Sequence, residues 1–156
     1  MATADVVVIG GGVIGSAIAY TLAGQKQTTI LVDKNRPGRE ASAAAAGILA
    51  VSSDRSKHGP LYQLKRASQE LYPALIQDLE RQTGIDIEYQ TVGVLGLIRN
   101  DADEKKYRSL YDLRREQGHL VTWLSADEVH RVEPALTTGL GGAVHFSGDH
   151  HLHNGK

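Results

Sequence analysis

The sequence predicts an α/β fold that opens with a βαβ unit and continues into a region of mixed α+β type. Three observations lead to this prediction. The apolar run DVVVIG begins at Asp5, a stretch with helical spacing follows at residues 13–23, and a second apolar run, TTILVD, ends at Asp33. Short apolar runs rich in β-branched residues are typical of buried parallel strands. A strand, a helix and a strand within about 30 residues form a βαβ unit, whose crossover we expect to be right-handed.

Beyond this unit, the spacing of leucines predicts a long amphipathic helix. The residues that set the spacing are Leu61, Leu64, Leu71, Leu75 and Leu79. Pro73 lies inside this helix, and we expect it to kink or divide the helix because its ring blocks one intrahelical hydrogen bond. Alternating or continuous apolar residues then predict strands at residues 85–89 and 92–98.

The last third of the chain predicts two helices and a strand. One helix begins at Asp101 and ends near Gly118. The sequence SADE, residues 125–128, is a capping box that starts a short helix, and Pro134 stops that helix. The apolar run GGAVHF, residues 141–146, predicts the final strand.

Composition and charge argue against several classes of protein. The 156 residues correspond to about one domain, and the formal net charge of −1 gives no sign of a nucleic-acid partner. No apolar run reaches about 18 residues, so we expect no membrane span. The N-terminus lacks the charged region of a signal peptide. Because the chain has no cysteine, it has no disulfide and no thiol redox centre, and a cytoplasmic location is the default.

The chemically informative motif lies in the turn between the first strand and the first helix. Gly10, Gly12 and Gly15 form the pattern G-x-G-x-x-G that dinucleotide binding requires. Gly10 permits the tight turn, Gly12 lets a pyrophosphate approach the backbone, and Gly15 lets the helix pack close to the strand. The helix start presents unpaired N–H groups to the phosphates. Asp33 ends the second strand, where a carboxylate can bind a ribose hydroxyl and would repel a 2′-phosphate, which argues against NADP.

The segment REASAAAAGIL, residues 39–49, favours FAD over NAD. A nicotinamide-binding domain would continue from the second strand directly into a third strand. This chain runs instead through the alanine-rich segment and a polar loop into the long helix. Small residues let backbone N–H groups reach a cofactor without intervening side chains. Taken alone, residues 43–46 would be interpreted as a simple helix start, because alanine is the best helix former.

Several motifs together make the chain resemble the N-terminal half of the glycine oxidase family. They are VVVIGGGVIGSAIAYTLA, LVDK, EASAAAAGIL, LYPAL, TGIDIEY, VGVL and WLSADEVHRVEPAL. These FAD-dependent amine oxidases of thiamine (thiazole) biosynthesis belong to the D-amino-acid oxidase and sarcosine oxidase superfamily. The resemblance implies a Rossmann-like FAD-binding βαβ unit of the glutathione-reductase-like type, with the start of an α+β substrate domain. The implied division is a discontinuous FAD domain from residues 1–83, the first part of the substrate domain at 84–147, and a truncated return at 148–156.

The resemblance also implies which residues contact FAD, which lies extended in the family. The pyrophosphate would meet Gly10, Gly12, Val13, Ile14 and Gly15; the adenosine ribose would meet Asp33, with Lys34 beside it; the phosphate or ribityl region would meet Ala41 and Ser42; and the flavin would meet Ala46, Gly47 and Ile48. The family more often has Glu at the ribose position, so Asp33 is a small and compatible departure.

The activity that the resemblance implies is amine oxidation, with hydride transfer from the substrate α-carbon to the flavin. Glycine, sarcosine or small D-amino acids would react with oxygen to give an oxo-acid, ammonia or an amine, and hydrogen peroxide, in a homo-oligomeric full-length protein. The family's substrate-binding arginine lies in its C-terminal half, so we name no catalytic residue here. The C-terminal FSGDHHLHNGK resembles the point where the family's chain turns back to the FAD domain, so we expect a truncated chain.

Alternatives remain open for the function and for one histidine cluster. The chain could belong to another FAD enzyme of the superfamily, such as a sarcosine oxidase or a D-amino-acid dehydrogenase, or act as a non-catalytic nucleotide-binding module or subunit. His150, His151 and His153 lie close to Asp149, and two histidines on one face of a strand are potential metal ligands. We favour a solvated turn and expect no metal, because no third ligand is obvious nearby.

Overall fold

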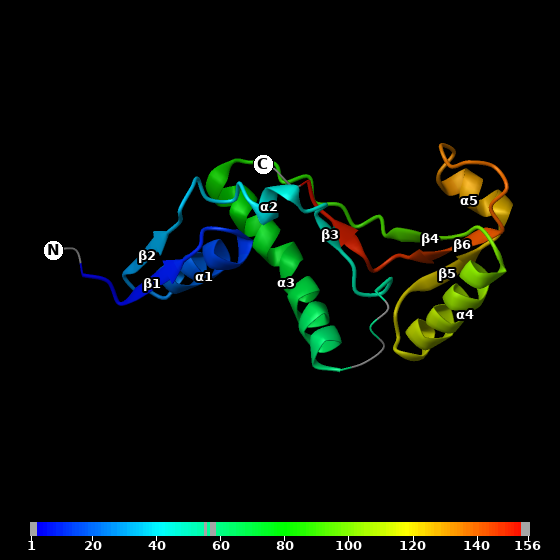
Figure 1. Ribbon diagram of the computed structural model, residues 1–156, viewed down its shortest axis with the longest axis horizontal. Helices are drawn as coiled ribbons and strands as arrows, with labels where there is room; N and C mark the ends of the chain where they lie inside the picture. Colours follow the sequence, from blue (N-terminus) through cyan, green and yellow to red (C-terminus); the bar gives the residue numbers. More distant parts are fainter. Residues whose placement is uncertain (1–2, 55, 57–58, 154–156) are drawn as a thin grey trace. The chain divides into compact units, whose positions relative to one another are not determined.

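The computed structural model describes residues 3–54, 56 and 59–153, and the chain divides into two compact units (Figure 1). The first unit ends at Ala46 and the second begins at Gly47. The boundary near residue 83, between a FAD domain and a substrate domain, stays a prediction.

A parallel βαβ arrangement forms the first unit, as the sequence predicts. The strands β1 (Val6–Ile9) and β2 (Thr29–Val32) pair in parallel, and α1 (Val13–Gly24) connects them. A single helical turn, α2 (Ala41–Ala44), follows. Because parallel strands end at the same edge of a sheet, the glycine turn after β1 and Asp33 after β2 lie close together.

The first unit leaves much of its apolar surface exposed. No residue of α1 is buried, and the side chains of Ile9 and Ile14 are 87% and 75% exposed. The residues of β1 and β2 alternate between half-buried and exposed, so the expectation that these strands are buried is wrong for the described chain. The reason is that one helix on a two-stranded sheet cannot cover both faces.

The second unit is built on a three-stranded antiparallel sheet in the order β4–β6–β5. The predicted strands β4 (Val94–Ile98) and β6 (Gly142–Phe146) are confirmed. The third strand, β5 (Val121–Leu124), has no counterpart in the predicted elements. It pairs with β6 so that Trp123 lies opposite Val144.

Two helices cover the two faces of this sheet (Figure 1). They are the predicted α4 (Asp101–Glu116) and α5 (Ala126–Val132). Successive residues of β6 point to opposite faces, so this strand contributes to both cores. The core with α4 contains Leu110, Val144 and Phe146, and the core with α5 contains Leu124, Val129, Leu140 and Ala143. The predicted capping box at Ser125 and Glu128 is confirmed.

A short antiparallel pair and a long helix complete the second unit. The strand β3 (Ile48–Leu49) pairs with β7 (His150–His151), and the helix α3 (Pro60–Thr83) has 24 residues. Within the ranges that the structure describes, no helix is both long and apolar enough to cross a membrane.

Residues 85–89 do not form the predicted strand. The N–H of Ile87 donates to Glu80 Oε1 at 2.9 Å, and the N–H of Glu88 donates to Asp86 Oδ1 at 2.9 Å. Side chains therefore take the donors that a strand ladder would use. Glu88 has a φ of 53°, and this left-handed conformation interrupts an extended segment.

Pro73 does not divide α3, contrary to one of the two outcomes that the sequence predicts. The helix continues without interruption from Pro60 to Thr83. Pro73 is exposed, so the carbonyl of Gln69, which loses its N–H partner, lies on the solvent side of the helix. Water can bond to that carbonyl, which lets the helix accommodate the proline at a cost in stability.

We therefore expect the substitution Pro73→Ala to stabilise the protein. Alanine restores the missing N–H and has the highest helix propensity, so the free energy of unfolding should rise by about 1–3 kcal/mol. Urea denaturation followed by circular dichroism measures this change. The control, Gln77→Ala at another exposed position of α3, should change the free energy by less than about 0.5 kcal/mol. A loss of stability in Pro73→Ala would contradict this account of the helix.

Candidate functional site

The glycine turn between β1 and α1 depends on the absence of two side chains. Gly10 has a φ of 105°, in the region that favours glycine. A Cβ on Gly15 would lie less than 3.0 Å from the carbonyl oxygen of Gly10, closer than real Cβ atoms approach. The first turn of α1 therefore packs directly against the backbone that leaves β1, as the motif predicts.

The N-terminus of α1 brings Ser42 to the glycine turn. The first intrahelical bond runs from the Ser16 N–H to the Gly12 carbonyl oxygen at 2.9 Å, so the N–H groups of residues 13–15 have no partner within the helix. The Val13 N–H donates to Ser42 Oγ at 2.9 Å, and a Cβ on Gly12 would lie 3.2 Å from the same oxygen. Residues from two distant parts of the predicted site, the glycine turn and the alanine-rich segment, thus meet at this helix end.

Asp33 lies beside the glycine turn and bonds to its backbone. Its Oδ2 accepts a hydrogen bond from the Gly11 N–H at 2.6 Å, and its Oδ1 accepts one from the Asn35 N–H at 2.7 Å. The bonds from Asn35 and Gly11 hold the pKa of the Asp33 carboxyl below its ordinary value. The carboxylate is therefore ionised at neutral pH. Beside it, Lys34 Nζ lies 3.6 Å from Glu40 Oε1 in an exposed ion pair.

The alanine-rich segment contains a short helix and a glycine turn. Ala41 and Ser42 begin α2, which ends after one turn, and Ala46 follows as an exposed residue. Gly47 has a φ of 71°, and a Cβ there would lie less than 3.0 Å from the carbonyl oxygen of Leu152. The simple helix start at residues 43–46 is therefore wrong, because residues 43–44 end α2 and Ala45 is extended. Gly47 is required for close backbone packing against Leu152.

The predicted flavin residues Gly47 and Ile48 lie in the second unit, where an open groove of about 570 Å³ begins at Ile48. The groove is lined by Ile48, Leu49, Ala50, Val51, Asp54, Leu64, Lys65, Ser68, Gln69 and Tyr72. Asp54 and Lys65 form an ion pair in this lining. The hydrogen bond from Lys65 lowers the pKa of the Asp54 carboxyl to about 2, so one anion and one cation accompany the apolar side chains.

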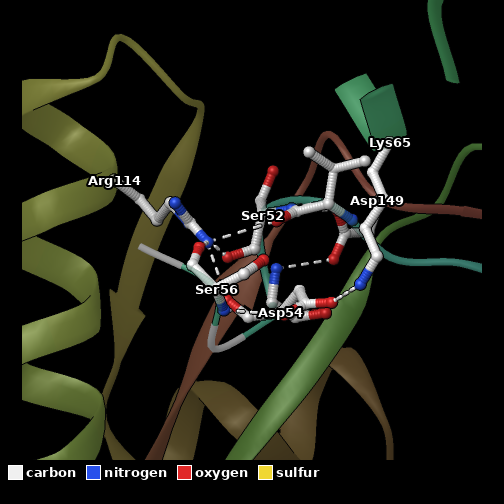
Figure 2. Close-up of polar contacts among 8 residues, drawn as sticks. Ser52, Asp54, Ser56, Lys65, Arg114 and Asp149 are labelled. Atoms are coloured by element: carbon white, nitrogen blue, oxygen red, sulfur yellow. Dashed lines mark hydrogen bonds and ion pairs between the residues drawn. The ribbon is translucent and has the colours of Figure 1, made fainter. Parts of the chain in front are cut away.

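Two buried ions hold the segment that follows β3 (Figure 2). The carboxylate of Asp149 accepts the N–H groups of Val51, Ser52 and Ser53 at 3.0, 2.7 and 2.8 Å. The guanidinium of Arg114, which reaches in from α4, donates to carbonyl oxygens of the same segment. Both side chains are fully buried, so their charges are compensated by hydrogen bonds.

His119 extends this polar cluster. Its Nδ1 lies 3.1 Å from Ser52 Oγ, and its Nε2 bonds with the Tyr62 hydroxyl. Burial, followed by the positive charges of Arg114 and Arg66, lowers the pKa of His119 below its ordinary value of 6.5, and Asp149 opposes this shift. The neutral imidazole is therefore the favoured form at neutral pH.

The sequence alone indicates no role for Arg114, Ser52 or His119, and it suggests Asp149 only as a neighbour of the histidine cluster. The burial of Arg114 could have been predicted from the sequence, because Arg114 falls on the stripe of α4 that includes Leu110. A charged residue on an apolar stripe is rarely buried without partners. The carboxylate of Asp149 had no comparable signal, since its partners lie 96 to 98 residues away.

The histidine cluster lies at β7, so the solvated turn that the sequence suggested is wrong for His150 and His151, which are half-buried and paired with β3. His150 packs edge-on against Tyr89, with ring centroids 5.4 Å apart, and its Nδ1 bonds with the Tyr89 hydroxyl. In the part of the chain that the structure describes, no group of three His, Cys, Asp or Glu side chains is arranged to hold a metal ion.

The contact between Gly15 and Gly10 makes a prediction about the first unit. A Gly15→Ala substitution should lower the local free energy of opening of α1 by about 2–4 kcal/mol, because the backbone of the turn must move. Gly24→Ala is the matched control: a Cβ there meets no atom within 4 Å, so it should change the free energy by at most about 1 kcal/mol. Hydrogen exchange of the α1 amides measures both. Equal protection in the two variants would contradict the assigned contact.

The lowered pKa of His119 predicts a pH dependence of stability. In the unfolded chain the imidazole binds its proton near pH 6.5, whereas the folded protein resists protonation, so stability should fall as the pH drops from about 7 to 5. His119→Gln should reduce this fall. His153→Gln, at an exposed position, should leave the His119 contribution in place. Urea denaturation across this pH range measures the difference, and an unchanged profile in His119→Gln would refute the prediction.

Comparisons with known proteins agree on one family. A family model described as FAD dependent oxidoreductase (DAO) matches residues 5–156. Glycine oxidase from Bacillus licheniformis is 36% identical over 148 residues, which cover 95% of this chain and 39% of that protein. Hydrogen cyanide synthase subunit HcnC from Pseudomonas aeruginosa is 27% identical over 184 residues, covering 96% of this chain and 44% of that protein.

Solved structures give the same result. The crystal structure of glycine oxidase from Geobacillus kaustophilus matches with a TM-score of 0.91 and 36% identity, over 96% of this chain and 40% of that one. Iminodiacetate oxidase from Chelativorans sp. BNC1 matches with a TM-score of 0.79 and 28% identity, over 94% and 40%. The chain spans about two fifths of the length of these relatives. The family match over residues 5–156, supported by these relatives, shows that the chain belongs to the FAD-dependent oxidoreductases of the DAO family.

Proposed function

We propose that this chain is the FAD-binding N-terminal portion of an amine oxidase of the glycine oxidase type. The observation that carries the proposal is the meeting of the glycine turn, Asp33 and Ser42 at the N-terminus of α1. Asp33 accepts the Gly11 N–H at 2.6 Å and Ser42 accepts the Val13 N–H at 2.9 Å. The three parts of the predicted nucleotide site are therefore held in one place by hydrogen bonds.

The residues at this helix end fit the adenosine diphosphate half of FAD. Gly12 has no Cβ to separate a pyrophosphate from the backbone, and the N–H groups of Ile14 and Gly15 lie at the positive end of the α1 dipole. The ionised Asp33 carboxylate uses one lone pair on each oxygen for Gly11 and Asn35, which leaves acceptor capacity for a ribose hydroxyl. Its charge disfavours a 2′-phosphate at the same position.

The remaining site residues form the second part of the proposal. Lys34 lies beside the ribose position, Ala41 and Ser42 serve the phosphate or ribityl region, and Ala46, Gly47 and Ile48 serve the flavin ring. The apolar lining that begins at Ile48 suits an aromatic ring system. FAD, when bound, accepts the hydride of the substrate; these residues would bind and orient it.

We propose oxidation of glycine, sarcosine or small D-amino acids as the activity of the whole protein. The substrate amine, oxygen and water would give an oxo-acid, ammonia or an amine, and hydrogen peroxide. Support comes from the glycine oxidases that match nearly the whole chain. We assign no catalytic residue within residues 1–156. A role in thiamine biosynthesis, a cytoplasmic location and a homo-oligomer belong to the proposal through the resemblance alone.

A second candidate is another FAD-dependent oxidase or dehydrogenase of the superfamily. The match to iminodiacetate oxidase at a TM-score of 0.79 favours this candidate. Both candidates require the same nucleotide site, so they differ only in substrate and electron acceptor. A non-catalytic nucleotide-binding module would share the site and show no turnover with any amine.

Titration of the purified chain with FAD, followed by flavin fluorescence, tests the proposal. We expect saturable binding that ADP competes for and NADP does not. Asp33→Ala should weaken FAD binding by about tenfold or more, because it removes charge-assisted hydrogen bonds to the ribose and to the Gly11 N–H. Asp101→Ala, which removes an exposed carboxylate from α4, is the matched control and should bind FAD like the unmodified chain.

Two outcomes would overturn parts of this proposal. If the folded chain binds neither FAD nor ADP, the nucleotide site is wrong. If the chain of residues 1–156 releases peroxide with glycine, the expectation that its catalytic groups lie elsewhere in the protein is wrong.

A further inference from the structure

The peptide groups of Val51 and Ser52 lie between two buried ions of opposite charge. Their N–H groups donate to Asp149 Oδ1 at 3.0 and 2.7 Å. Their carbonyl oxygens accept from Arg114, Val51 from Nη2 at 3.3 Å and Ser52 from Nε at 2.8 Å. Figure 2 shows Arg114 and Asp149 to either side of Ser52. Each of these two residues therefore bonds to Asp149 through its N–H group and to Arg114 through its carbonyl group.

Further residues after Ser52 bond to the same two ions. The Ser53 N–H donates to Asp149 Oδ2 at 2.8 Å. Arg114 Nη2 also donates to the carbonyl oxygens of Asp54 at 2.7 Å and Ser56 at 2.9 Å. Charge-assisted hydrogen bonds of this kind are stronger than neutral ones, so residues 51–54 and Ser56 have a strongly favoured backbone geometry.

The strand that follows Asp149 fixes the residues before this segment. In β7, His151 lies opposite Ile48 of β3, and the Leu152 N–H donates to the carbonyl oxygen of Gly47 at 3.0 Å. Asp149 and the three residues after it therefore contact residues 47–49 and 51–53. This stretch begins with the two residues that we propose to meet the flavin.

A buried polar cluster of this type determines geometry more than it adds stability. Removing two ions from water is costly, and apolar side chains of the same volume stabilise a core at least as well. Satisfied networks of charged groups and peptide dipoles do, however, specify one backbone arrangement. Apolar packing also reaches this stretch, because Val51 is buried, and the Gln69 side chain of α3 donates to the carbonyl oxygen of Leu49 at 2.7 Å. The backbone of residues 51–53 nevertheless bonds directly to the two buried ions, and that of residues 48–49 pairs with β7.

We infer that Arg114 and Asp149 are positioning residues for the flavin half of the cofactor. They do not touch the cofactor; they hold the segment after β3, and through it Gly47 and Ile48, in the geometry that receives the ring. The inference rests on the proposed function, because it presupposes that Gly47 and Ile48 meet the flavin.

Paired affinities for ADP and FAD test the inference on the full chain. Under the proposed function, ADP would contact residues of the first unit only, whereas FAD would also contact Gly47 and Ile48. The ratio of the two dissociation constants therefore reports on the flavin half alone. The variants are Asp149→Asn, which removes the charge, and the milder Arg114→Lys, which keeps the charge and loses the planar fork. Their matched controls are Asp112→Asn and Arg115→Lys, at exposed positions of α4.

We expect both test variants to lower the affinity for FAD by about tenfold and to leave the affinity for ADP unchanged. The two controls should preserve the affinities for both ligands. Thermal denaturation identifies a variant that fails to fold, in which case Arg114→Lys, as the milder substitution, decides the question.

The possible failures are distinct. If the unmodified chain binds neither ligand, the proposed function fails, and this inference fails with it. If the unmodified chain binds FAD more tightly than ADP but folded variants keep the same ratio, or lose both affinities equally, the proposed function stands and the positioning role is wrong. If the unmodified chain binds FAD no more tightly than ADP, residues 47–48 do not receive the flavin and the inference is overturned.

Discussion

The second unit is organised by a contact in which buried ions share the same peptide groups. Ser52 lies 97 residues from Asp149 and 62 residues from Arg114 along the chain, yet it bonds to both. The hydrogen bonds of each ion are satisfied largely by the backbone. The N–H groups of the segment face the carboxylate, and its carbonyl groups face the guanidinium. Three segments that are remote in sequence, the loop after β3, the end of α4 and the start of β7, thereby acquire a fixed relation to one another.

Local signals predicted most of the regular elements. The βαβ unit was predicted from the spacing of apolar residues and from the glycine turn, and the helix at residues 126–132 was predicted from its capping box. These features depend on neighbours within a few residues. The failures have non-local or competing causes. Residues 85–89 have the composition of a strand, but side chains of Glu80 and Asp86 take their N–H groups. The strand β5 owes its existence to pairing with β6, which lies about 20 residues further along the chain.

The residues of the candidate site also differ in whether local sequence signals could identify them. Gly10, Gly15 and Asp33 could be identified because a strand, a turn and a helix in sequence fix where they lie. The bond from the Gly11 N–H to Asp33 could not be foreseen, since it requires the actual distance between two strand ends. Arg114 was visible in principle, as a cation on an apolar stripe, whereas the role of Asp149 exists only once β7 has paired with β3. Pattern therefore locates a cofactor site more readily than it locates the residues that shape it.

Gly47 has a consequence for how such motifs persist during evolution. The close approach of the Leu152 carbonyl and the φ of 71° both demand glycine at this position, whether or not a cofactor lies nearby. Gly15 is constrained in the same way by the carbonyl of Gly10. A descendant that had lost its flavin would still be selected to keep these glycines in order to fold. Gly15 and Gly47 are thus required by the fold itself, and their retention in a related chain would not by itself demonstrate that a cofactor is still bound.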